Sequence, residues 1–143
     1  MQNYEQAAAG LATYLTRFCP GGRYCVNAMH YAANSYYMLE QYEQAKEQYM
    51  ELTKIDGNPY MEKACMRVAE ISYDQKDYST ALTYFERMYA AASDQNMAQT
   101  ALLGMMRCSH YINNNDASIK HATSMLALED LSNAIYNEAL YYR

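Results

Sequence analysis

The sequence is poor in the residues that interrupt helices and in the largest aromatic side chain. Its 143 residues include two prolines, five glycines and no tryptophan. Because all-β folds need frequent turns built on glycine and proline, this scarcity favours long helices joined by short turns. The chain is also long enough to bury a hydrophobic core. The composition therefore predicts an all-α fold in a single domain.

The sequence also lacks long apolar runs and clusters of basic residues, which argues against a membrane span and a nucleic-acid partner. No run approaches the roughly 18 consecutive apolar residues of a membrane span, and the polar start does not look like a signal peptide. The formal net charge is −5, and the basic residues are scattered among acidic ones. Nucleic acid is therefore not an expected partner, because phosphate binding needs a clustered basic surface. We expect no membrane span either.

Tyrosine is abundant, with seventeen residues against two phenylalanines. A tyrosine ring is apolar, whereas its hydroxyl needs water or a partner. A tyrosine-rich helical protein is therefore expected to be built from thin layers, in which rings are buried and hydroxyls reach an edge.

The four cysteines fall into two kinds. Cys65 and Cys108 lie in apolar helical patterns and are interpreted as small core residues. Cys19 and Cys25 flank Pro20, where a local disulfide would form in an oxidising compartment. The favoured interpretation is two separate thiols, because Cα atoms at helix edges are often too far apart for a bridge. Whether the two are bridged stays open.

A repeat of 36 residues organises the chain. Three alanines recur at this spacing, at Ala45, Ala81 and Ala117, and the opening YEQA of residues 4–7 returns letter for letter at 42–45. Such two-helix units cannot bury their apolar faces alone, but stacked units share a continuous core. Small residues are then expected where helices cross closely.

Each unit is predicted to contain two helices. Apolar residues at i, i+3, i+4 and i+7 predict a first helix over 26–38, and Tyr42 begins a second one. The predicted segments of the single domain 1–143 are a second helix (about 1–19), a unit (26–56), a second unit (62–92), a degenerate unit (98–128) and a further first helix (131–143). Because neither end carries an evident polar cap, we expect a fragment of a longer protein.

The unit resembles the tetratricopeptide repeat, whose pattern is W-x2-L-G-x2-Y…A-x3-F…P. The leading tryptophan and closing proline are missing here. The three copies are Met29-x2-Ala32-Ala33-x2-Tyr36…Ala45-x3-Tyr49, Cys65-x2-Val68-Ala69-x2-Ser72…Ala81-x3-Phe85 and Ala101-x2-Gly104-Met105-x2-Cys108…Ala117-x3-His121. The resemblance implies a right-handed α-α superhelix of antiparallel helix pairs, a TPR solenoid.

A second likeness concerns compartment. The segment Arg17-Phe18-Cys19-Pro20-Gly21 is similar to linkers in bacterial cell-envelope members of the family. These members include outer-membrane assembly lipoproteins and the Tol-Pal-associated division coordinator. The resemblance implies a periplasmic or cell-envelope location, which nothing else in the sequence indicates.

The family likeness also implies a site. First helices line a concave groove that binds a peptide or a helical segment of a partner protein, so the chain is expected to be a scaffold. Tyrosine and methionine in such a groove suit adaptable contact. Carried over by register, the groove residues are Asn27, His30, Asn34, Tyr37, Met38, Lys63, Met66, Glu70, Tyr73, Asp74, Gln99, Leu102, Met106, Ser109 and His110.

Two alternatives to this site remain. Tyr37, Met66 and Met106 could merely fill space between adjacent helices. The whole chain could also be architectural or self-associating, with no separate ligand, forming a homo-oligomer. Exposed pairs such as Tyr141-Tyr142 would serve such contacts.

Enzyme and metal chemistry are not expected. His30, Glu70 and His110 could meet across one groove as metal ligands, but they come from three different units and no HExxH-like pair fixes two ligands on one helix. His121 takes an aromatic's place in the repeat and is interpreted as a core or edge residue. No glycine-rich phosphate loop occurs. We therefore expect no catalysis, no metal and no cofactor.

Overall fold

The computed structural model describes residues 2–19 and 24–143, and within them the regular secondary structure is helical throughout, which confirms the all-α class. The chain separates into two compact units, unit 1 (Met1–Val68) and unit 2 (Ala69–Arg143). The described residues form eight helices: α1 Gln2–Phe18, α2 Cys25–Met38, α3 Tyr42–Thr53, α4 Met61–Asp74, α5 Tyr78–Ala91, α6 Gln95–Tyr111, α7 Asn115–Leu126 and α8 Asn133–Tyr142.

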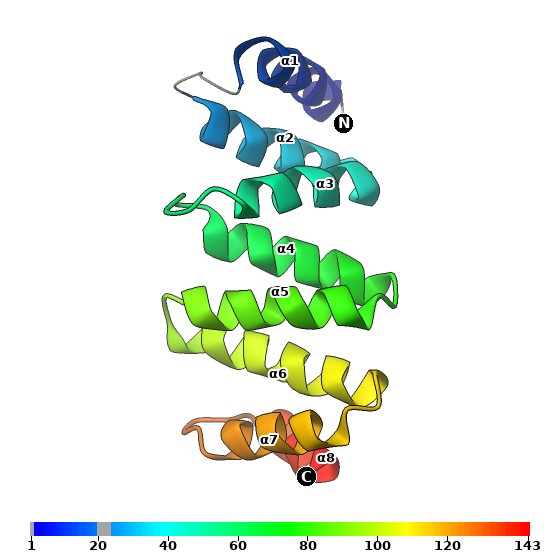
Figure 1. Ribbon diagram of the computed structural model, residues 1–143, viewed down its shortest axis with the longest axis vertical. Helices are drawn as coiled ribbons and strands as arrows, with labels where there is room; N and C mark the ends of the chain where they lie inside the picture. The colour runs from blue at the N-terminus through cyan, green and yellow to red at the C-terminus, as the bar shows by residue number, and fades with distance from the viewer. Residues whose placement is uncertain (1, 20–23) are drawn as a thin grey trace. The chain divides into compact units, whose positions relative to one another are not determined.

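In unit 1, α2 packs along both α1 and α3 (Figure 1). The helices approach closely because alanines occupy the crossing points: Ala32, Ala33 and Ala45 are fully buried. Tyr49 and Leu52 of α3 complete this core and are also fully buried. Small residues on one helix and large ones on its neighbour fill the interior at the density that native cores require.

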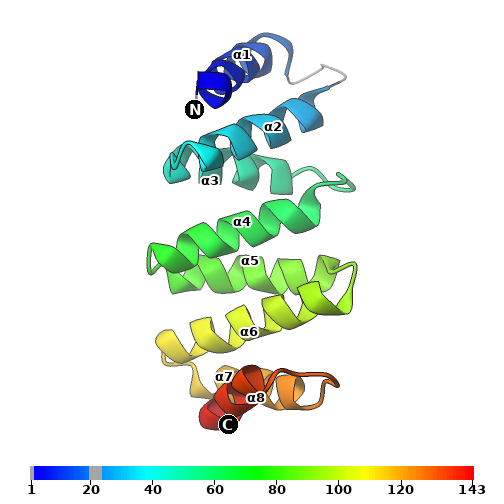
Figure 2. The same cartoon turned by 180° about the vertical axis from the view of Figure 1, so that it is seen from behind.

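In unit 2, α5, α6 and α7 pack in chain order, and α8 lies against both α7 and α6 (Figure 1, Figure 2). Its core contains Ala81, Met88 and Met125. Gly104 of α6 has a specific packing role, because a Cβ atom added there would lie 2.6 Å from the ring of Phe85. The missing side chain lets that ring lie directly on the α6 backbone.

The turns that join α2 to α3, α4 to α5, and α6 to α7 share one geometry. Each contains one left-handed residue, Glu40 (φ 59°), Lys76 (φ 62°) or Asn113 (φ 60°). In the first turn the Glu40 amide donates to the Tyr37 carbonyl at 3.0 Å and the next amide to the Tyr36 carbonyl at 2.9 Å, and both other turns repeat these bonds at the same lengths. This is the Schellman arrangement that ends helices.

The third repeat, formed by α6 and α7, departs from the predicted 36-residue spacing. The left-handed turn residues lie 36 residues apart and then 37 apart. Compared with α3 and α4, α5 is two residues longer and α6 is three residues longer, while the segment between them is four residues shorter, which leaves a net insertion of one residue. The equivalent of Ala81 is therefore Ser118, which is 2% exposed, and the predicted Ala117 is only half-buried. The alignment of Ala117 and His121 with the repeat is wrong by one residue.

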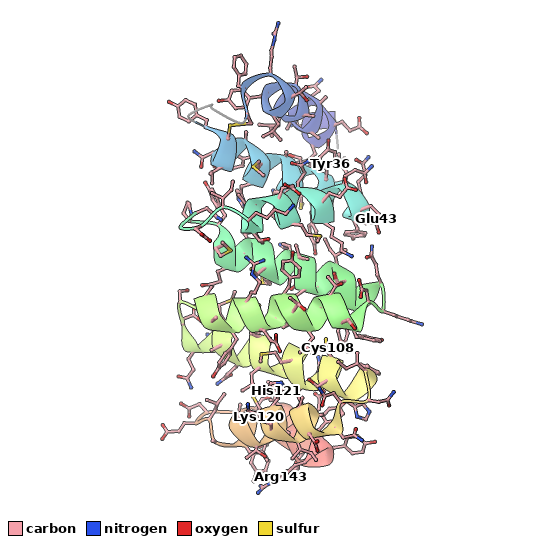
Figure 3. All side chains as sticks on the ribbon, in the orientation of Figure 1. Tyr36, Glu43, Cys108, Lys120, His121 and Arg143 are labelled. Carbon is pink, nitrogen blue, oxygen red and sulfur yellow. A yellow bond between two sulfur atoms is a disulfide. The ribbon has the colours of Figure 1, made fainter. Side chains whose placement is uncertain are left out.

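Cys19 and Cys25 are joined by a disulfide with a Cα–Cα distance of 5.8 Å, inside the range that a bridge requires (Figure 3). The favoured interpretation of two free thiols is therefore wrong. The two residues stand at facing helix ends, because Cys19 follows the last residue of α1 and Cys25 is the first residue of α2. Pro20 and the glycines after it lie outside the described residues.

Cys65 and Cys108 are free and 0% exposed, which confirms their assignment to the core. No helix in residues 2–19 and 24–143 combines the length and hydrophobicity needed to cross a membrane.

Candidate partner-binding surfaces

The structure divides the predicted groove residues by exposure. Three are exposed: Asn27, Met38 and Asp74. Eight are partly exposed: Asn34, Tyr37, Lys63, Met66, Glu70, Tyr73, Gln99 and His110. Four are buried, so their placement on a partner-facing surface is wrong: His30, Leu102, Met106 and Ser109.

Three of the four buried residues are misplaced for one reason. They belong to α6, where the 37-residue spacing to the turn shifts each position by one residue, and one residue turns a helix by about 100°. Counted back from the turn, the surface equivalents of Met66, Glu70, Tyr73 and Asp74 are Leu103, Arg107, His110 and Tyr111, all at least partly exposed. Asn113 is the sequence signal for this register, because asparagine tolerates the left-handed conformation.

His30 is buried by an aromatic contact that the repeat pattern could not reveal. Its ring stacks on the ring of Tyr60 at 3.9 Å with an interplanar angle of 3°. The Tyr60 hydroxyl donates to Asn27 Oδ1 at 2.8 Å. Burial lowers the pKa of His30, with the positive charge of Lys63 as a second cause. The imidazole is therefore held neutral inside unit 1.

The partly exposed ring of Tyr37 is fixed from two sides in unit 1. The Arg67 guanidinium lies 4.1 Å from its centroid, a cation–π contact. Tyr42 at the start of α3 packs edge-on at 5.5 Å and 72°. The ring is therefore presented in a defined orientation.

Unit 2 contains an equivalent pair of edge-on tyrosines, and a third tyrosine takes the place of the arginine. Tyr73 and Tyr78 pack edge-on at 5.4 Å and 73°, as Tyr37 and Tyr42 do. Tyr111, which is 49% exposed, stacks on Tyr78 at 4.4 Å. Burial, with Tyr111 as the next cause, raises the pKa of Tyr73 to about 12, so its phenol stays neutral. The three rings form a cluster where the C-terminal ends of α4 and α6 meet the start of α5.

A bidentate ion pair borders this tyrosine cluster. Arg107 Nε and Nη2 donate to the two carboxylate oxygens of Glu138 at 2.6 and 2.8 Å, which ties α6 to α8. The hydrogen bond raises the pKa of Arg107 and lowers that of Glu138. The Tyr142 ring lies 4.7 Å from that of His110. Charge and aromatic surface therefore lie together on unit 2.

Cysteine and histidine, residue types common in catalytic sites, both occur in unit 2. Cys108 lies on α6 and His121 on α7 (Figure 3). Burial raises the pKa of Cys108 to about 12, so the thiol is not activated. No group of three or more metal-ligating side chains occurs among the described residues. A hollow of about 380 Å³ is lined by Ala12, Thr13, Thr16 and Arg17, without an acid–base pair.

Comparison with known proteins adds no family to this geometry. No family model matches the chain, and no curated protein matches it.

Proposed function

We propose that the chain is a tetratricopeptide-type right-handed superhelix whose first-helix faces bind a peptide or helical segment of another protein. The observation that supports this proposal is the threefold helix–turn–helix geometry, with one turn conformation at spacings of 36 and 37 residues. Alanines at the crossing points support the same assignment. Stacked hairpins of this kind present one side of every first helix to the same partner.

The proposed binding residues combine rigid rings, flexible thioethers and polar heads. Tyrosine rings already fixed by neighbours lose little conformational entropy on binding, and methionine adapts to irregular surfaces. In unit 1 the residues are Asn27, Asn34, Tyr37, Met38, Lys63 and Met66. In unit 2 they are Glu70, Tyr73, Asp74, Gln99, Leu103, Arg107, His110 and Tyr111.

A second candidate function is architectural self-association. It is favoured by exposed apolar side chains on α8, where Tyr141 is 78% exposed and Tyr136 and Leu140 are also exposed. The disulfide between Cys19 and Cys25 favours an oxidising compartment such as the periplasm for either function. We propose no catalytic role.

Site-directed photo-crosslinking in a native extract tests the binding proposal. A photoreactive amino acid is placed at Met38 or Asp74, exposed residues on first helices of the two units. Matched control positions are Glu47 on α3 and Ala90 on α5, which are exposed on second helices. All four sites are at the surface, so folding is expected to be unaffected.

The binding proposal predicts that Met38 and Asp74 capture one protein through a single segment, and that Glu47 and Ala90 do not. Equal capture from all four positions would contradict it. Capture of further copies of the chain alone would replace it with self-association.

A further inference from the structure

Helix α1 is the least buried of the helices of unit 1. Among its described side chains Ala8 alone is buried, whereas α3 buries Ala45, Tyr49, Leu52 and Thr53. Leu11 and Leu15 on α1 remain partly exposed. A helix with so little buried surface opens locally at a low free-energy cost. Although α1 packs along the length of α2, it therefore adds few fully buried side chains to unit 1.

The Cys19–Cys25 disulfide lies at one end of the contact between α1 and α2. It joins the residue after α1 to the first residue of α2, across a sequence separation of 6. Both cysteines are partly exposed, whereas the free Cys65 and Cys108 are completely buried. A thiol reagent therefore reaches the disulfide in the folded protein without reaching the other two sulfurs.

We propose that this disulfide is a redox-active site that latches α1 onto α2, and that its substrate is a dithiol reductant. One thiolate of the dithiol attacks a sulfur of the pair, forms a mixed disulfide and releases the other cysteine as a thiolate. The second thiol of the reductant then displaces the remaining cysteine. Two electrons pass to the chain, the reductant becomes a disulfide, and Cys19 and Cys25 become thiols.

Reduction favours release of α1 because the covalent link is lost and only the packing along α2 remains. The opened state regains the chain entropy that the closed ring removes, and for a ring this small that entropy corresponds to about a 50-fold change in the opening equilibrium. Opening exposes Ala8 and the apolar side of α1, together with the surface of α2 beneath it. The chain would thus present a new apolar face only in its reduced form.

Hydrogen exchange measured by mass spectrometry tests the latch. The intact chain is compared in its oxidised form and after treatment with dithiothreitol, with peptides covering α1 and α3. We expect amides of α1 to exchange about 50-fold faster after reduction, and amides of α3 to change less than about twofold. Unchanged exchange in α1 would overturn the proposal, and so would an equal increase in α1 and α3.

The Cys19→Ser/Cys25→Ser variant is the matched control. It keeps Cys65 and Cys108, so any effect of dithiothreitol through those residues persists in it. We expect α1 of the variant to exchange at the rate of the reduced chain and not to respond to dithiothreitol. A variant that protects α1 as well as the oxidised chain does would also overturn the latch.

Discussion

At the scale of single residues, the surroundings of two glycines predict opposite effects of substitution by alanine on the free energy of unfolding. Gly104→Ala places a Cβ against the Phe85 ring, so we expect a net loss of about 1–2 kcal/mol in unfolding free energy despite the better helix propensity. Gly10→Ala meets nothing within 4 Å, so we expect a gain of up to about 1 kcal/mol. Urea unfolding measures both variants. Stabilisation by both would show that Phe85 does not lie on the α6 backbone.

The neutral His30 makes stability depend on pH. Its pKa is lowered below the ordinary value of 6.5, so the unfolded chain binds more protons there than the folded chain does. The resulting contribution is present above pH 6.5 and is lost as pH falls below it. His121, whose pKa is also lowered by burial, acts with the same sign.

We therefore expect the urea midpoint to fall between about pH 7.5 and about pH 5.5, and to fall less in a His30→Gln variant. The variant keeps His121, so part of the dependence remains. An identical fall of the urea midpoint in the original chain and the variant would show that His30 is protonated equally in the folded and unfolded states.

At the scale of elements, the net insertion of one residue between the α4–α5 turn and the α6–α7 turn decides which residues of the third repeat are in the core. Ser118→Leu should cost about 1–3 kcal/mol by overpacking, as should Ala45→Leu and Ala81→Leu, because all three positions are buried. Ala117→Leu, at a half-buried position, should cost less than about 1 kcal/mol. Thermal unfolding of the four variants checks this register, and a larger loss at Ala117 than at Ser118 would contradict it.

The repeat alignment located the buried alanines of the first two repeats but missed the buried residue of the third, for a physical reason. Ala45 and Ala81 are 36 residues apart, the same spacing as the left-handed turn residues Glu40 and Lys76 that precede α3 and α5. The net insertion lies between the core residues Met88 and Ala101, around the connection of α5 to α6. It leaves the 3.6-residue periodicity within each helix intact, so periodicity alone could not locate it. The burial of His30 depends on Tyr60, and the disulfide depends on how two helix ends face each other. Neither arrangement leaves a periodic signal.

At the scale of the whole molecule, composition was enough for the all-α class, because few prolines and glycines leave little material for an all-β fold. The superhelix and its partner remain proposals. Repeat surfaces are generic, and function depends on the side chains that a repeat displays. The binding proposal assigns this role to Tyr37, which contacts Arg67 and Tyr42, and to Tyr73, which contacts Tyr78 and Tyr111.

The most direct test of the binding proposal is calorimetric titration with the crosslinked partner segment, synthesised as a free peptide. It is titrated into the original chain, a Met38→Ala/Asp74→Ala variant and a matched Glu47→Ala/Glu86→Ala variant, whose residues are exposed on second helices. We predict that the first variant weakens binding by about tenfold or more, the equivalent of about 1.4 kcal/mol, and that the second changes it less than about twofold. Equal affinity for all three proteins would contradict a binding surface on the first helices.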